Sequence, residues 1–219
     1  MRLFGPCTCS ILFCRGNVRV CPSVARLPTW GQSRIPHHAE MLDLDSGDVI
    51  VSERFTVRVA SPGLHFNAAH FVIFGPDSCE SIHGHDFRVS ATIEGDLSPT
   101  GWVVDFVVLE SALAQIIREF DHTLLVPGES PWLQVVNDGT SIELRAGLRS
   151  WRFPSGDCRM IPIPNVTTEL LARYIGVCLR EKLHAELGHG VAGLKAMTIE
   201  LSESEGCTAS WTCAFSAQG

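Results

Sequence analysis

Three histidines stand at a spacing that suits a bound metal ion. His70 lies in the segment FNAAHF, and His83 and His85 lie in SIHGHDF. In a strand, residues i and i+2 point to the same face, so the imidazoles of His83 and His85 can be directed at one point. His70 ends the preceding extended segment, and an antiparallel return places it beside them. Three neutral imidazoles without a fourth protein ligand are typical of a catalytic zinc site with an open position.

An isolated HxH pair is more often a chance pattern, with His70 as an ordinary core residue, so further polar residues matter. Cys79 precedes His83 by four positions, and a thiolate beside a cation can act as a base or nucleophile. Free cysteines are otherwise small buried hydrophobic residues. Asp121 and His122 follow a predicted helix end, where a carboxylate can set the tautomer of an imidazole and prepare it for proton transfer.

Two further acidic signals lie late in the chain. Thr167, Thr168 and Glu169 open a predicted helix, and Glu203 follows a predicted strand. Carboxylates at such places can bind the N–H groups of a ligand. The Thr-x-Glu pattern can equally be part of a helix cap, and Glu203 can be a solvated strand end.

Composition excludes several classes of protein. The chain has 219 residues, 45% of them hydrophobic and 19% charged, which indicates a globular protein with a substantial core. The net charge of −7 and the lack of a basic patch argue against nucleic acid as a partner. No run of about 18 apolar residues occurs, so a membrane span is not expected. The nine cysteines are odd in number and form no CxxC pair in the body of the chain, which predicts a reduced cytoplasmic protein.

Residues 1–40 differ in composition from the rest of the chain. They contain five arginines and four cysteines but no acidic residue before Glu40. They could be a targeting peptide, a zinc-binding tail, or translated sequence upstream of a true start at Met41. We favour the last interpretation. Residues 1–40 are therefore expected to be an extension outside the fold, and residues 41–219 to form the domain.

Hydrophobic periodicity predicts an α+β fold. Alternating or extended segments predict strands, and helical spacing predicts one helix from Phe106 to Phe120, capped by Asp105, and another that begins at Thr167 or Thr168. Runs of strands with helices between them favour an antiparallel sheet with helices on one face. The region 128–163 is rich in proline and glycine and predicts an inserted hairpin. The predicted strands lie at residues 54–60, 64–72, 86–93, 194–201 and 209–215.

Together these segments resemble the 6-pyruvoyltetrahydropterin synthase and 6-carboxytetrahydropterin synthase family. The resemblance runs from about residue 54 to 215. CESIHGH is similar to its most specific motif, Cys-x3-His-Gly-His, and FNAAHF to its first zinc-histidine motif. The other segments that carry the resemblance are GWVVDF, DHTLL, VTTELLA and IELSESEGCTASW.

The resemblance implies a fold, an assembly and a reaction. The fold would be the tunnelling fold, a four-stranded antiparallel sheet with two helices on one face. Trimers would close the sheets into a barrel, two trimers would stack into a homohexamer, and active sites would lie between subunits. The substrate would be 7,8-dihydroneopterin triphosphate. The implied roles are zinc binding by His70, His83 and His85, proton transfer by Cys79, Asp121 and His122, and pterin recognition by Thr167, Thr168, Glu169 and Glu203.

Departures from the family pattern leave the product open. Leu170, Trp211 and Ser204 stand where the family usually has Asn, Tyr and Thr. Glu80 stands where the branch that forms 6-hydroxymethyldihydropterin for folate has a glutamate, so it is an alternative base or simply a loop residue. The favoured product is 6-carboxytetrahydropterin, on the route to queuosine-type deazapurines. The alternatives are the pyruvoyl-forming synthase, the folate-branch cleavage, and a non-catalytic pterin-binding oligomer.

Overall fold

The computed structural model describes residues 53–215. The predictions for residues 1–40, and for a domain that begins at Met41, therefore concern a segment outside the described residues. The helices and strands are β1 Phe55–Val59, β2 His65–His70, β3 Ile73–Gly75, β4 Ser78–Cys79, β5 His83–Gly95, α1 Phe106–Ile117, β6 Thr123–Pro127, β7 Gln134–Asn137, β8 Ser141–Ala146, β9 Arg149–Pro154, β10 Cys158–Ile161, α2 Thr168–Leu187, β11 Leu194–Ser204 and β12 Cys207–Ala214.

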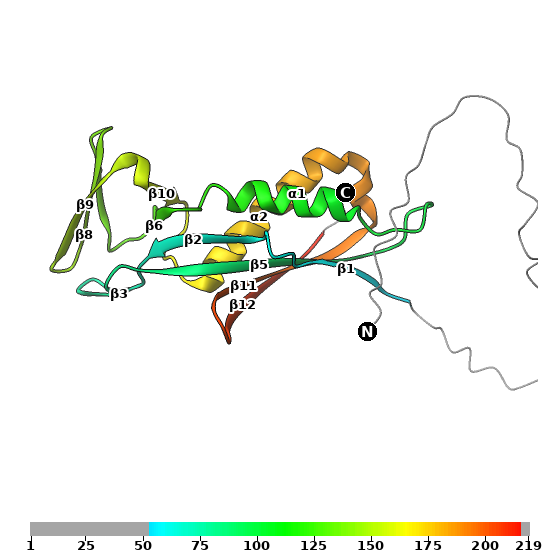
Figure 1. The fold of residues 1–219 in the computed structure, drawn as a ribbon, viewed down its shortest axis with the longest axis horizontal. Helices are drawn as coiled ribbons and strands as arrows, with labels where there is room; N and C mark the ends of the chain where they lie inside the picture. Colours follow the sequence, from blue (N-terminus) through cyan, green and yellow to red (C-terminus); the bar gives the residue numbers. More distant parts are fainter. Residues whose placement is uncertain (1–52, 216–219) are drawn as a thin grey trace, which may run out of the picture. The chain divides into compact units, whose positions relative to one another are not determined.

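The main sheet is organised around the long strand β5 (Figure 1). Its order is β10-β6-β2-β5-β11-β12, and β1 also pairs with β5. The first half of β5 pairs with β2 and the second half with β1, both antiparallel, while β11 runs along its other side. The predicted antiparallel sheet is therefore confirmed as the centre of the fold.

Two short strands widen this sheet to seven, beyond the five strand segments predicted from periodicity and the four-stranded sheet that the resemblance implies. β6 pairs in parallel with β2, and β10 pairs in parallel with β6. Four consecutive residues of β6 are buried, so the strand lacks the alternation of a half-exposed strand. A short apolar run of this kind gives no periodic signal in the sequence, which is why these strands were not predicted.

Both helices cover one face of the main sheet (Figure 1). The carboxylate of Asp105 accepts a hydrogen bond from the amide of Val107 and caps α1. The hydroxyl of Thr167 accepts one from the amide of Leu170 and caps α2. Both caps confirm the predicted helix starts, because each side chain satisfies an amide that has no partner within its helix.

The inserted region forms a sheet of its own instead of a simple hairpin. Its strand order is β7-β8-β9, with both pairings antiparallel. The extra strand β7 is mostly exposed, so its sequence has no apolar alternation that would predict it. The insertion has a second hydrophobic core, whose buried members are Phe71, Ile73, Leu124, Val126, Leu133, Ile142, Leu144 and Ala146.

Two predictions, on the state of the cysteines and on membrane spans, can be compared with residues 53–215. The five cysteines between residues 53 and 215 are all free thiols. No helix in this range combines the length and the apolar character needed to cross a membrane.

A glycine in α2 allows the helix to approach β12 closely. A Cβ added to Gly176 would lie 2.3 Å from Cζ3 of Trp211 and 3.1 Å from Cγ1 of Ile199. Glycine normally costs a helix about 1 kcal/mol relative to alanine. Here the indole ring of Trp211 occupies the space in which the methyl group of an alanine would lie.

We expect Gly176→Ala to lower the free energy of unfolding by roughly 1–3 kcal/mol, because overpacking outweighs the gain in helix propensity. Urea denaturation at one fixed protein concentration measures this. Trp211→Leu in the same chain should recover most of the loss, with Trp211→Leu alone as the reference. A stabilised Gly176→Ala variant would show that the indole moves aside at little cost.

Candidate metal centre

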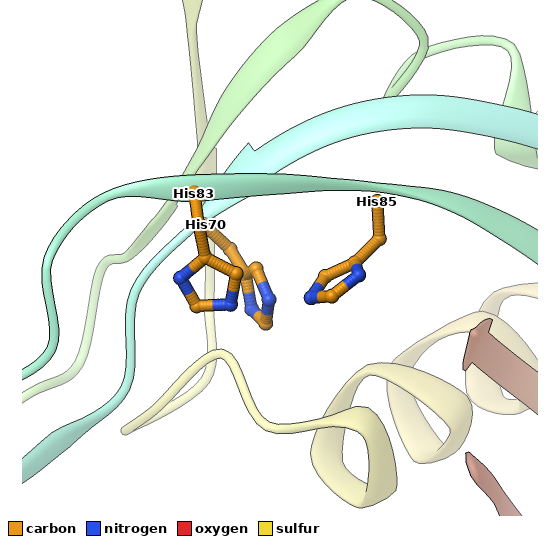
Figure 2. Close-up of side chains that lie close together, drawn as sticks. All are labelled: His70, His83 and His85. Carbon is orange, nitrogen blue, oxygen red and sulfur yellow. The ribbon is translucent and has the colours of Figure 1, made fainter.

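The pairing of β2 with β5 brings the three histidines together. His70 is directly opposite His83, and His85 is opposite Ala68, whose small side chain leaves room for the imidazole. The ring centroids of His70 and His83 are 4.6 Å apart, those of His83 and His85 4.9 Å, and those of His70 and His85 5.3 Å. One ring nitrogen from each lies within 4.8 Å of the others, and Figure 2 shows the rings on one side of β5.

Backbone carbonyl groups orient two of the three imidazoles. Nδ1 of His70 lies 2.9 Å from the carbonyl oxygen of Val166, and Nδ1 of His83 lies 2.9 Å from that of Ser81. A carbonyl can only accept, so each Nδ1 carries a proton, and in the neutral form of the ring Nε2 is left with its lone pair. This arrangement, with the second ring nitrogen held by a backbone carbonyl, is typical of metal-ligating histidines.

The Nε2 atom of His70 has no hydrogen-bond partner, which is unusual for a buried polar atom. Among the buried side-chain nitrogen and oxygen atoms of residues 53–215, it alone lacks a hydrogen-bond partner. His70 is only 2% exposed, and this burial lowers the pKa of its imidazole, so the ring stays neutral. A neutral imidazole with a free, inward-directed lone pair fits a metal ligand, and the three histidines could hold a metal ion.

The first residue of α2 holds a carboxylate of β11. The hydroxyl of Thr168 donates a hydrogen bond of 2.7 Å to Oε2 of Glu203 on β11. The negative charge of Glu203 also acts on the imidazole of His70, where it opposes part of the lowering of the pKa. Thr167 is used as the helix cap, and Glu169 is exposed in the first turn. The structure therefore joins Thr168 to Glu203, whose charge acts on His70, and leaves Glu169 exposed.

Asp121 and His122 form a hydrogen-bonded pair on the other face of the sheet. Nδ1 of His122 lies 2.9 Å from Oδ2 of Asp121, and Oδ1 of Asp121 accepts the amide of Asn67 at 2.9 Å. The hydrogen bond from the Asn67 amide, and to a smaller extent the imidazole of His122, lower the pKa of the Asp121 carboxyl. His122 has a φ of 59°, a conformation uncommon outside glycine, and borders a groove with Asn67, Gly84 and Asp86. Gly84 and Asp86 alternate with the ligand histidines along β5, so the pair faces away from them.

Cys79 and Glu80 lie on the β3–β4 hairpin and its exit toward β5. Cys79 is half-buried and packs against the second core. The carboxylate of Glu80 accepts a hydrogen bond of 3.2 Å from the amide of Val72 and lies 3.9 Å from Nδ1 of His83. The Glu80 carboxylate is therefore close to a histidine of the cluster.

Two residues of the site were not predicted. Val166 supplies the carbonyl that orients His70, and Asn165 bonds both backbone groups of Ile73, at 3.0 Å to the amide and 2.9 Å to the carbonyl. These contacts tie the loop before α2 to β3. A backbone carbonyl leaves no mark in the sequence, and Asn165 is separated from Ile73 by 92 positions, so no local pattern could have found them.

The sequence model of 6-pyruvoyl tetrahydropterin synthase matches residues 61–213, which include every residue of the site described above. The chain belongs to this family. It is accordingly a lyase-type enzyme that acts on a pterin, and the fold is the tunnelling fold of that family.

Relatives and solved structures agree with this assignment. A Pyrococcus horikoshii protein named as a provisional 6-carboxy-5,6,7,8-tetrahydropterin synthase is 32% identical over 136 residues, which cover 62% of this chain and 79% of that protein. The Plasmodium falciparum 6-pyruvoyl tetrahydropterin synthase structure is 28% identical with a TM-score of 0.70, covering 75% of this chain and all of that one. A Plasmodium vivax synthase structure at 26% identity, with the same TM-score and coverage, is described as a mutant in which a catalytic glutamate is replaced by alanine.

We expect His83→Ala to weaken the binding of a divalent metal. Loss of an outer hydrogen-bond partner of a ligand lowers metal affinity by roughly 10- to 100-fold, and loss of a ligand should lower it by more. Titration with Co²⁺, followed by its visible absorption, measures the affinity. His65→Ala is the matched control, since His65 lies on β2 but is exposed and paired with Asp86. Equal affinities in the two variants would exclude His83 as a ligand.

Proposed function

We propose that the chain is a zinc-dependent lyase that converts 7,8-dihydroneopterin triphosphate to 6-carboxy-5,6,7,8-tetrahydropterin, on the route to queuosine-type deazapurines. The observation that carries the proposal is the cluster of His70, His83 and His85, and the charge of Glu203 that acts on His70 supports it. The name of the Pyrococcus horikoshii relative supports the carboxy product. The free thiols of the described cysteines support a cytoplasmic location.

The proposed division of labour follows from the chemistry of each group. Zinc, when bound, would act as a Lewis acid toward the side-chain hydroxyls of the substrate. The carboxylate of Glu203 would accept two hydrogen bonds from the amino and ring N–H groups of the pterin, a planar and bidentate recognition. The hydroxyl of Thr168, which donates to Oε2 of Glu203, would keep that carboxylate in place.

We further propose a homohexamer whose active sites are completed by neighbouring subunits. Asp121 and His122 are directed away from the histidine cluster of their own chain, which supports a role in the site of another chain. Within the described residues the main sheet is open, with β10 and β12 at its ends. An unpaired edge such as β12, eight residues long, favours pairing with a second copy.

The position of Glu80 favours a second candidate reaction, the cleavage of the side chain to 6-hydroxymethyldihydropterin. Its carboxylate lies 3.9 Å from Nδ1 of His83, whereas Cys79 packs against an apolar core. The catalytic glutamate of the Plasmodium vivax structure supports a carboxylate in such a role. The two reactions share the metal centre and the pterin site and differ in the base.

We expect Cys79→Ala to abolish the carboxy product while zinc stays bound, because loss of a general base typically costs about 100- to 10,000-fold. The same variant should keep some cleavage to 6-hydroxymethyldihydropterin, and Glu80→Ala should lose it. Mass spectrometry of the products from dihydroneopterin triphosphate compares the two variants. Wild-type products at wild-type rates from Cys79→Ala would make the cysteine structural, and unchanged products from Glu80→Ala would exclude the second reaction.

We expect the inactive variants His83→Ala and His122→Ala to restore activity when they are co-expressed in equal amounts. If each site combines His83 of one subunit with His122 of another, random mixing leaves about a quarter of the sites intact. Activity of the purified mixed oligomer measures this, with each variant alone as the control. A mixture as inactive as its components would show that each site belongs to a single chain.

A further inference from the structure

The inserted sheet β7–β9 packs against the segment that carries Cys79 and Glu80. Phe71, just after β2, and Trp151 on β9 have ring centroids 5.3 Å apart. Ile82, in the loop that leads to His83, and Cys79 pack against the same core as the buried side chains of β8. The insertion and this segment therefore share one apolar core.

The turn between β8 and β9 touches the turn between β3 and β4. Gly147, at a φ of +56°, would place an added Cβ 3.0 Å from both Cα and the carbonyl carbon of Asp77. Asp77 precedes Ser78 and Cys79, so the contact is two residues from the thiol. Backbone atoms cannot rotate away as a side chain can, and only glycine lets the two turns meet.

A hydrogen bond joins the first residue of β9 to the loop before His83. Nη1 of Arg149 donates to Oγ of Ser81 at 3.1 Å, and the carbonyl of Ser81 accepts from Nδ1 of His83 at 2.9 Å. Within residues 53–215, no carboxylate lies within 4.0 Å of the Arg149 guanidinium, while the two other arginines of the inserted sheet form ion pairs with acidic residues of the insertion. Ser81 is thus the partner that fixes this cation.

We propose that the inserted sheet is a support that holds residues 77–83 against the metal centre, with Gly147 and Arg149 as positioning residues. Gly147 sets the distance of the hairpin that carries Cys79 and Glu80. Arg149 fixes Ser81, whose carbonyl orients the imidazole of His83. The catalytic purpose of this support rests on the proposed function, but the support itself is a property of the fold.

Hydrogen–deuterium exchange tests the support without any assay of activity. Gly147→Ala and Gly139→Ala both place alanine at a positive φ, so the backbone cost is shared. A Cβ at Gly139 meets nothing within 4 Å, which makes it the matched control. We expect Gly147→Ala to speed exchange in peptides spanning residues 72–82, where the amide of Glu80 bonds the carbonyl of Val72. Exchange as slow as in the wild type, or an equal change in both variants, would overturn the proposal.

Kinetics of Arg149 variants test its consequence for the reaction. We expect Arg149→Ala to lower kcat by about 10-fold with little change in KM, the size of effect typical of lost outer-shell orientation, and Arg149→Lys to recover part of it. A higher KM with an unchanged kcat would mean that Arg149 binds the substrate's phosphates, and it would overturn the positioning role. If the wild type does not turn over the pterin triphosphate, the proposed function fails, while the exchange result still decides whether the support exists.

Discussion

The antiparallel register between β2 and β5 is the constraint on which the rest of the site depends. It sets His70 opposite His83 and stacks Phe66 on Phe87, with ring centroids 4.9 Å apart. Because side chains alternate along a strand, a slip of one residue would turn His70 to the solvent face and Phe66 out of the core. The same register therefore buries the phenylalanine pair and assembles the histidine cluster. The pairing of the two strands brings the three histidines together, and the carbonyl groups of Val166 and Ser81 then orient two of their rings.

The two faces of β5 carry different kinds of side chain. One face carries His83, His85 and then the core residues under the helices. The other face is polar: Ser90 is 6% exposed and is held by Arg58 and Glu200, at 3.0 Å and 2.9 Å. The Asp121–His122 pair lies on this second side, where Asn67 fixes its carboxylate. A single strand thus separates groups that the proposed reaction needs in one place, and a hexamer with shared sites would reunite them.

The parts predicted from the sequence are those with a local signal. The histidine spacing predicted that the three imidazoles cluster, and single polar side chains predicted both helix caps, at Asp105 and Thr167. The parallel strands β6 and β10 have no alternation that would mark them. The Val166 carbonyl and the Arg149–Ser81 contact join segments that are 96 and 68 positions apart. These contacts depend on how distant loops meet in the fold, and the spacing of residues within one segment does not predict that.

X-ray absorption of the zinc-loaded protein decides whether the three histidines hold the metal. We expect three imidazole nitrogens and one further oxygen around zinc at about 2.0–2.1 Å, with no sulfur. We also expect His83→Ala to change this pattern and Cys79→Ala to leave it intact. A sulfur scatterer at about 2.3 Å that disappears in Cys79→Ala would contradict this expectation, because the thiol would then be a ligand and could not be the base. A wild-type spectrum that lacks the three-imidazole pattern, and that His83→Ala does not change, would place the metal elsewhere in the chain.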